Sequence, residues 1–266
     1  MESATFGHVR EDGLVELPTG VALQFQLIAP PPRNQHSGVT ATRDGKLAVC
    51  LHPWSWLGGR MNDPVLHSLT GVLQEQGYHI LRYNSRAVGR STGRASFTGF
   101  DEGKDLEAIV QWAAREVKDV STVVIIGYSH GALITTLHPT LDQDPPPFKL
   151  AYVLLSYPLG TRGILTRFKG SYYEQKLDEL VSAGKSKVLI AFGGHDEFTA
   201  FGKYNAWAAQ LESKAFEEPD TGEKVLRVLA VPGASHFWLD ETHDTLCAEL
   251  SSWLSSLYVP NSASGA

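Results

Sequence analysis

The chain has 266 residues, of which 42% are hydrophobic, and it carries a formal net charge of −6 at pH 7. A chain of this length and composition can bury a full core, so we expect a single domain over residues 1–266. The mild negative charge and the lack of a long basic run disfavour nucleic acid and anionic membrane surfaces as partners.

The cysteine content and the apolar segments indicate the compartment. Cys50 and Cys247 are too few for a disulfide framework, and we interpret them as buried thiols, with a single bridge as the alternative. No apolar run reaches the roughly 20 residues of a membrane span, and the first residues lack the pattern of a secretory signal. We therefore expect a cytoplasmic protein.

The first third of the chain predicts an edge hairpin followed by buried strands. A turn at Pro18-Thr19-Gly20 separates two weakly alternating segments that read as an antiparallel pair. Asp63 and Pro64 have the pattern of an N-cap and a first helical residue. The expected elements are strands at Phe6–Glu16, Val21–Ile28, Leu47–Leu51 and Tyr78–Tyr83, a polar surface loop at 33–45, and a helix from Asp63 to Gly77.

The rest of the chain alternates strand and helix without repeats. Strands are expected at Val123–Ile126, Lys149–Leu155, Val188–Phe192 and Val225–Val231, and helices at Asp101–Val117, Phe198–Phe216 and Asp240–Tyr258. Residues 159–187 lack a strand and predict a small cap with a short helix at Tyr173–Val181, and 259–266 a disordered tail. This order predicts an α/β fold, with a mostly parallel sheet that is covered by helices on both faces.

The most informative stretch is VVIIGYSHGAL at 123–133, in which an apolar strand runs into a tight turn and then a helix. Such a turn strains its central residue and needs small residues two positions before and after it. Gly127 and Gly131 meet this need around Ser129. The strain would expose the Ser129 hydroxyl, and it would aim the His130 N–H at the atom that Ser129 attacks.

A nucleophilic serine needs a base, and the base needs an acid. Asp196 and His236 each follow a predicted strand, and the order serine, aspartate, histidine is that of the α/β-hydrolase arrangement. Asp196 could instead cap the next helix, and Glu197 is a rival acid. A lone histidine such as His236 is more often a packed or surface residue, but three suitable residues at three strand ends favour a triad.

An oxyanion hole needs two N–H donors. His130 is the first candidate, and Trp54 is the second because Pro53 has no N–H, with Ser55 as the fallback. Trp54 and Trp56 could also be loop aromatics that pack on the first helix. The spacing of histidines and cysteines does not match common metal motifs, so we expect no metal and no cofactor.

The segments LHPWSWLGGRMND at 51–63 and RYNSRAVGRSTG at 82–93, followed by the serine turn, resemble small intracellular α/β-hydrolases related to dienelactone hydrolase. The resemblance covers Leu47–Leu257 and implies an α/β-hydrolase fold. It also implies the site: Ser129 as nucleophile, Asp196 as acid, His236 as base, and Trp54 with His130 as oxyanion donors. Ala87 stands where the group usually has glycine, and the nucleophile is serine where dienelactone hydrolase itself has cysteine.

The hypothesis that follows is a serine hydrolase of small to medium carboxylic esters, which acts through an acyl-enzyme. The expected partner is therefore a small-molecule ester or thioester. Thioester, lactone or C–C bond hydrolysis is an alternative, since the same triad serves all of them, and a small-ligand binder without turnover is another. Four aromatic residues are expected as pocket walls, although each could be core: Tyr157, Phe198, Phe237 and Trp238.

Overall fold

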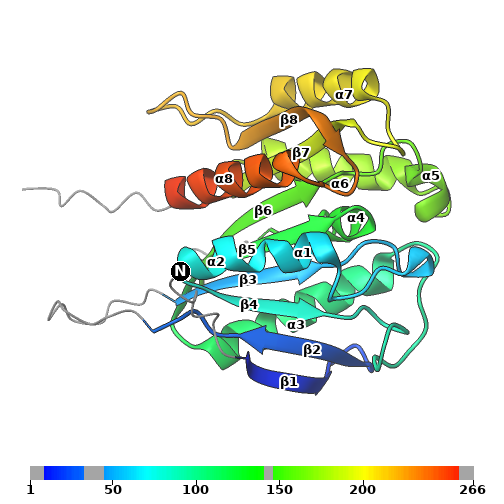
Figure 1. Ribbon diagram of the computed structural model, residues 1–266, viewed down its shortest axis with the longest axis vertical. Helices are drawn as coiled ribbons and strands as arrows, with labels where there is room; N and C mark the ends of the chain where they lie inside the picture. The colour runs from blue at the N-terminus through cyan, green and yellow to red at the C-terminus, as the bar shows by residue number, and fades with distance from the viewer. Residues whose placement is uncertain (1–8, 33–44, 141–145, 258–266) are drawn as a thin grey trace, which may run out of the picture.

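The computed structural model describes residues 9–32, 45–140 and 146–257. They contain an eight-stranded sheet with the order β1-β2-β4-β3-β5-β6-β7-β8 (Figure 1). The six strands β4-β3-β5-β6-β7-β8 are each parallel to their neighbours in the sheet, whereas β2 is antiparallel to both β1 and β4. The strands are β1 (Val9–Glu16), β2 (Ala22–Ile28), β3 (Gly45–Leu51), β4 (Tyr78–Tyr83), β5 (Val120–Tyr128), β6 (Lys149–Leu155), β7 (Lys187–His195) and β8 (Leu226–Ser235).

Helices cover both faces of the sheet, and each face has its own hydrophobic core. Side chains of α3, α4, α6 and α7 pack on one face of the sheet, and side chains of α1, α2 and α8 pack on the other. Helices α1, α2 and α8 lie in front of the sheet in Figure 1. The helices are α1 (Pro64–Ser68), α2 (Thr70–Glu75), α3 (Phe100–Val117), α4 (His130–Thr135), α5 (Arg162–Leu165), α6 (Gly170–Ser182), α7 (Phe201–Lys214) and α8 (Glu241–Ser256), with a 3₁₀ turn, η1 (Ser55–Leu57).

The mostly parallel α/β sheet that the sequence predicts is confirmed. The continuous apolar runs become β3, β5 and β6, whose residues are buried on both faces because helices cover the sheet on either side. The edge hairpin is also present as β1 and β2. In the described ranges, no helix is both long and apolar enough to cross a bilayer.

Three expectations change in detail. Asp63 does cap a helix by accepting from the Val65 N–H, but Leu69 divides the expected single helix into α1 and α2. The helix expected from Phe198 begins only at Phe201. Within 159–187, α6 buries Tyr173 and its neighbours in a core, which leaves α5 and its flanks as the candidate cap. The expected tail and most of the loop at 33–45 lie outside the described residues.

Candidate active site

The turn between β5 and α4 has the geometry of a strained nucleophile elbow. Ser129 has φ 54° and ψ −116°, a backbone conformation that costs free energy for a residue with a side chain. A Cβ added to Gly127 or Gly131 would lie closer than 3.0 Å to backbone atoms, which for Gly131 are the carbonyl oxygens of Leu51 and His52. The two glycines are therefore required because the elbow packs directly on its own helix and on the end of β3.

Strand pairing brings the candidate acid and base together. His195 at the end of β7 pairs with Ser235 at the end of β8, just after an irregularity in the register. Asp196 and His236 are the next residues along the two strands, and the Asp196 Oδ2 lies 2.7 Å from the His236 Nδ1. Both side chains are almost fully buried. The contact has the geometry that fixes the tautomer and orientation of a catalytic imidazole.

The two carboxylates near this contact have different partners. Asp196 Oδ1 accepts from the backbone N–H groups of Phe198 and Thr199, and its Oδ2 also accepts from the Tyr204 hydroxyl. Asp196 therefore caps the following turn and contacts the imidazole at the same time. Glu197, the rival acid, instead accepts from the backbone N–H of His236 at 2.9 Å. Of the two, Asp196 is the one that contacts the ring.

Two residues that the sequence analysis did not single out hold the His236 backbone from the opposite side. The hydroxyls of Tyr128 and Ser156 both donate to the His236 carbonyl, at 3.1 and 3.3 Å. Ser156 Oγ also accepts from the Trp238 indole N–H, and Ser156 has φ 47°. Tyr128 is the last residue of β5, and Ser156 follows β6 directly. These positions at the ends of two apolar runs are the one signal in the sequence that points to the two hydroxyls.

These contacts place His236 over the strand that delivers Ser129, since Tyr128 precedes the serine directly and its ring lies 5.5 Å from the imidazole. The Ser129 N–H donates to the Leu155 carbonyl at 2.9 Å. Among the described residues, the Ser129 hydroxyl has no hydrogen-bond partner. The bond between the serine and the imidazole thus stays a prediction, and apo sites often form it only with substrate bound.

Two buried histidines belong to the segments that carry the candidate oxyanion donors: His52, which precedes Pro53 and Trp54, and His130 itself. Burial lowers the pKa of His52 to about 4, and burial together with His52 lowers the pKa of His130 to about 4. His52 Nδ1 donates to the Pro53 carbonyl, and its Nε2 accepts from the Ser85 N–H, which fixes the loop before Trp54. Within the described ranges, no cluster of three potential metal ligands occurs. The oxyanion roles of His130 and Trp54 stay predictions.

The four expected pocket walls divide into two pairs. Tyr157 belongs to one hydrophobic core, where it stacks on Trp207, and Trp238 belongs to the other. Neither presents surface to a ligand, as their exposures of 0% and 2% show. Phe198 and Phe237 are exposed and contact the edge of the His236 ring, at centroid distances of 4.7 and 5.5 Å. They remain as candidate walls.

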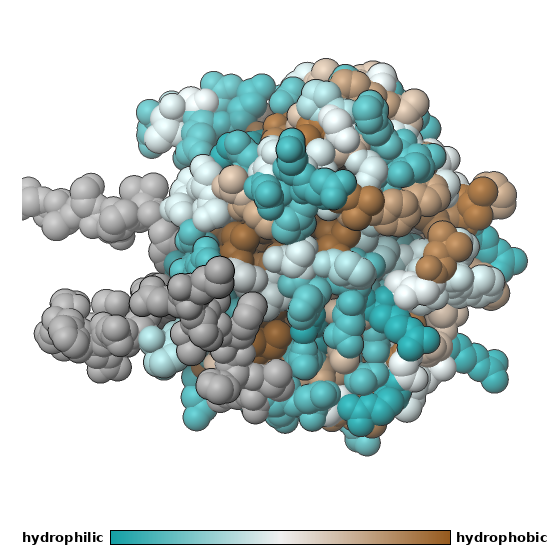
Figure 2. Space-filling view, in the orientation of Figure 1, coloured by the Kyte–Doolittle hydropathy of each residue, from teal (hydrophilic) through white to brown (hydrophobic). Residues whose placement is uncertain are grey.

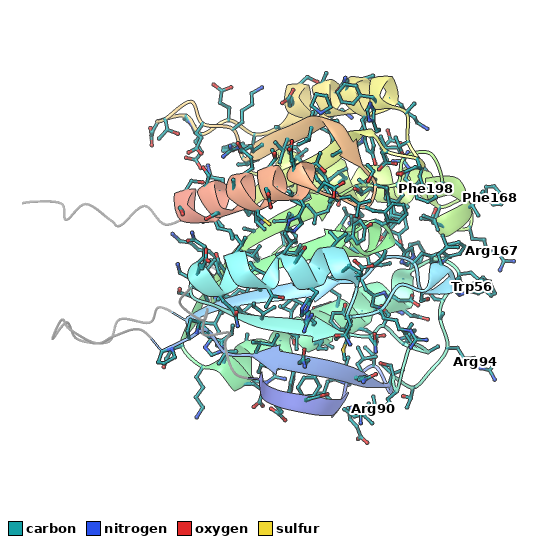
Figure 3. The ribbon with its side chains drawn as sticks, viewed as in Figure 1. Trp56, Arg90, Arg94, Arg167, Phe168 and Phe198 are labelled. Carbon is teal, nitrogen blue, oxygen red and sulfur yellow. The ribbon has the colours of Figure 1, made fainter. Side chains whose placement is uncertain are left out.

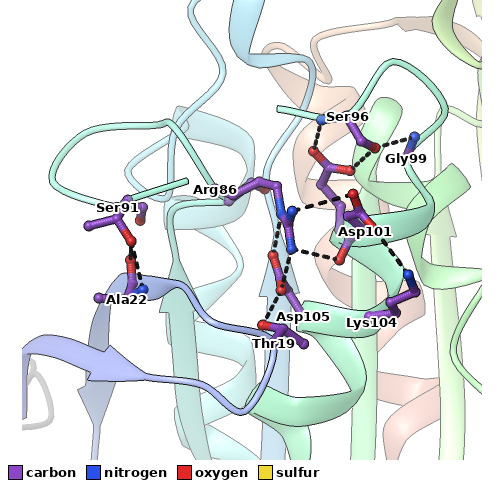
Figure 4. Close-up of polar contacts among 12 residues, drawn as sticks. Thr19, Ala22, Arg86, Ser91, Ser96, Gly99, Asp101, Lys104 and Asp105 are labelled. Atoms are coloured by element: carbon purple, nitrogen blue, oxygen red, sulfur yellow. Dashed lines mark hydrogen bonds and ion pairs between the residues drawn. The ribbon is translucent and has the colours of Figure 1, made fainter. Parts of the chain in front are cut away.

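The loop after β4 is held by polar contacts with the neighbouring elements (Figure 4). Near its start, the buried Asp105 carboxylate accepts two hydrogen bonds from Arg86, at 2.7 and 2.8 Å. Near its end, Glu102 accepts from the N–H and the hydroxyl of Ser96. Ala87 in this loop adopts φ 60°, which is the conformation that a glycine takes more easily. The expected departure at this position is thus an alanine held in a left-handed backbone conformation.

Sequence comparison gives one family match and two curated relatives. Residues 19–157 match the family described as X-Pro dipeptidyl-peptidase (S15 family). An uncharacterized protein from Schizosaccharomyces pombe is 26% identical over 214 residues, which are 79% of this chain and 86% of that protein. An uncharacterized protein from Rickettsia prowazekii is 34% identical over 88 residues, and the match spans 33% of this chain and only 37% of that protein.

Solved structures share the fold over nearly the whole chain. A serine hydrolase homologue from Coxiella burnetii has a TM-score of 0.63 and 25% identity, over 96% of this chain and 100% of that one. An α/β serine hydrolase without a lid from Xanthomonas campestris has a TM-score of 0.59 and 22% identity, over 94% of each chain. An esterase from Pyrococcus furiosus has a TM-score of 0.67 and 17% identity, over 94% and 93%. The α/β-hydrolase expectation is confirmed, whereas a specific link to dienelactone hydrolase is not among these findings.

Proposed function

Because this chain belongs to the X-Pro dipeptidyl-peptidase (S15) family and has the α/β serine hydrolase fold, we propose that it is an esterase of small to medium carboxylic esters. The observation that carries the proposal is the buried 2.7 Å contact between Asp196 and His236, at the sheet edge where the strained Ser129 is also found. In open α/β sheets, chemistry collects beyond the carboxyl ends of the strands.

The proposed reaction has two steps. The Ser129 Oγ attacks the ester carbonyl while His236 Nε2 takes the hydroxyl proton, and Asp196 stabilises the imidazolium. The backbone N–H groups of His130 and Trp54, or Ser55 in place of Trp54, stabilise the oxyanion. The intermediate collapses to an acyl-enzyme as His236 returns the proton to the alcohol. A water molecule, deprotonated by His236, then releases the carboxylic acid and restores Ser129.

The size of the substrate follows from the candidate cap. With α6 packed in a core, the short α5 and its flanks remain to cover the site, which suits an open pocket. Phe198 and Phe237 beside His236 offer apolar contact to a small or medium acyl group. Thioesters, lactones and C–C bonds are alternative substrates of the same machinery, and a ligand binder without turnover is the alternative outside catalysis.

The activity in the family's name, removal of an X-Pro dipeptide, is a further candidate. A dipeptidyl-peptidase holds the N-terminal ammonium of its substrate, for which a carboxylate is the usual partner. Two carboxylates near the triad candidates, Glu197 and Asp63, accept from the backbone N–H groups of His236 and Val65. A carboxylate with one backbone donor keeps lone pairs for an ammonium, so the peptidase activity is tested beside the esterase activity.

A substrate panel tests the proposal. It contains p-nitrophenyl esters of graded acyl length, acyl thioesters and alanyl-prolyl-p-nitroanilide, assayed on wild type and Ser129→Ala. We expect turnover of short esters that Ser129→Ala abolishes. Turnover of the anilide alone would assign the peptidase activity. Thermal stabilisation by esters without turnover by wild type would assign a binder and overturn the proposal.

A further inference from the structure

Exposed apolar side chains gather at one edge of the molecule. Eight of the eleven large hydrophobic residues that are exposed in the described ranges follow the carboxyl ends of parallel strands, and they are Trp56, Leu57, Phe97, Ile164, Phe168, Phe198, Phe237 and Leu239. The most exposed is Phe168, at 84%. Figure 2 shows hydrophobic side chains that project from this edge near α5. Such clustering marks an interaction surface more often than chance exposure.

Two arginines lie among these side chains. Figure 3 shows Phe168, Arg167, Trp56 and Arg94 along this edge, with Arg90 further round, where it pairs with Asp12. Arg94 and Arg167 are exposed, and within the described chain neither forms an ion pair. The Arg167 guanidinium lies 5.1 Å from the centre of the Phe97 ring. We call this surface the aromatic–arginine rim: Trp56, Leu57, Arg94, Phe97, Ile164, Arg167 and Phe168.

The backbone is strained to present the rim. Arg167 and Phe168 are consecutive residues with φ 46° and 66°, in a region where only glycine is at ease, yet both side chains point outward. The loop that carries Arg94 and Phe97 is held by the buried pair of Arg86 with Asp105 and by Glu102. The Phe97 and Arg94 side chains are therefore exposed on a loop that a buried ion pair and hydrogen bonds hold in place.

The acidic groups on the neighbouring elements do not neutralise the rim. Asp101 pairs with Arg86 and Lys104, and Glu174 pairs with Arg162. The exposed acids Glu197 and Asp240 lie on the loops after β7 and β8, and Glu197 accepts from the backbone N–H of His236. The net charge of −6 argues against an anionic partner for the chain as a whole, but in the described ranges Arg94 and Arg167 form no ion pair with these acids.

We propose that the aromatic–arginine rim docks this protein on an anionic lipid surface. Exposed aromatic and aliphatic side chains would enter the headgroup region, while Arg94 and Arg167 contact lipid phosphates. An anionic surface attracts arginines that lie close to it, and the acidic remainder of the protein would face away from it. The docked orientation turns the sheet edge that carries Ser129 toward the bilayer.

The test is co-sedimentation with vesicles, made with the Ser129→Ala protein so that binding does not depend on the proposed activity. The probes are phosphatidylcholine vesicles with and without about 30 mol% phosphatidylglycerol. We expect binding to the anionic vesicles that is at least roughly tenfold weaker in Arg94→Glu/Arg167→Glu and in Trp56→Ala/Phe168→Ala. The charge-matched control is Arg115→Glu/Lys149→Glu, two exposed cations that lie away from this edge, and it should bind as well as the parent.

Equal binding to neutral and anionic vesicles, or binding that the rim substitutions leave unchanged, would overturn the proposal. So would binding that the control variant loses as strongly, because general charge would then be the cause. Analytical ultracentrifugation tests whether a second copy of the chain, and not a lipid surface, covers the rim. A dimer of the parent that Phe168→Ala dissociates would assign the rim to a second copy of the chain.

Discussion

The nucleophile elbow and the loops after β7 and β8, which carry Asp196 and His236, lie at the same edge of the sheet. We call the latter the acid–base loops, and different contacts hold the two regions in place. The elbow is held by close backbone packing, for which Gly127 and Gly131 must lack side chains. The acid–base loops are held by side-chain hydrogen bonds, with Asp196 on the ring of His236 and Glu197 on its backbone. The Ser129 hydroxyl has no partner in the described part of the chain, whereas the imidazole is fixed before substrate arrives.

This difference determines which kind of substitution each part of the site tolerates. In the elbow, added volume should break the fold, because carbonyl oxygens occupy the space. In the acid–base loops, the loss of one acceptor should break activity with little loss of stability, because other hydrogen bonds keep His236 in place. Substitutions in the two regions should therefore be distinguished by their effects on stability and on activity.

The largest effect is expected from the acid. Asp196→Asn presents an amide to the His236 Nδ1 and favours the wrong tautomer, so ester kcat should fall by about 10³–10⁴-fold. The matched control is Glu197→Gln, whose amide oxygen can still accept from the His236 N–H, and it should lose less than about tenfold. Steady-state kinetics on a short p-nitrophenyl ester measures both. Equal losses in the two variants would contradict the assignment of Asp196.

In the elbow, we expect a large loss of stability. Gly131→Ala places a methyl group against the carbonyl oxygens of Leu51 and His52, and should lower the free energy of unfolding by about 3 kcal/mol. Gly71→Ala is the control, because α2 has open space there, and it should stabilise by about 0.5–1 kcal/mol. Urea unfolding measures both. A Gly131→Ala protein as stable as wild type would mean that the packing of the elbow is wrong.

Buried histidines should make the stability depend on pH. Burial lowers the pKa of His52, His130 and His138 to about 4, from an ordinary 6.5. Between pH 6.5 and 4 the unfolded chain therefore binds protons that the folded chain does not, so stability falls as the pH falls. Above about pH 7.5 these groups contribute almost nothing to the dependence, because the unfolded histidines are then neutral too.

His138 lies in the interior beside Tyr152, away from the triad candidates, and isolates this effect. His138→Gln should reduce the slope of unfolding free energy against pH by at most about 1.4 kcal/mol per unit. Urea titrations at several pH values between 7.5 and 4.5 give the two slopes. Identical slopes for wild type and variant would show that folding does not lower the pKa of His138.

The smallest effect concerns the loop after β4. Ala87→Gly relieves a left-handed backbone and should stabilise the fold by about 1 kcal/mol. Ala95→Gly in the same loop, where φ is not positive, should instead destabilise it by about 0.5 kcal/mol. Thermal unfolding compares the two. Stabilisation by both variants, or by neither, would show that the strain at Ala87 does not matter.

The nucleophile elbow could be predicted from sequence, whereas the hydrogen bonds that hold His236 could not. Backbone packing leaves a local mark, because glycines must stand two residues on either side of Ser129. The hydroxyl contacts of Tyr128 and Ser156 with His236 join residues 108 and 80 positions apart, and the ends of two apolar runs mark the positions of the hydroxyls but not their partner. Similarly, apolar periodicity gave the strands, but aromatic character alone could not separate the core residues Tyr157 and Trp238 from the exposed Phe198 and Phe237.

The central claim is that Ser129, His236 and Asp196 act as one unit, and covalent labelling tests it most directly. Intact-mass and peptide-mass measurements after reaction with a fluorophosphonate should find one adduct, on the peptide that contains Ser129. The adduct should be absent in Ser129→Ala and should form at least about 10³-fold more slowly in His236→Gln and Asp196→Asn. An adduct on another residue, or equally fast labelling in the His236 variant, would contradict the account.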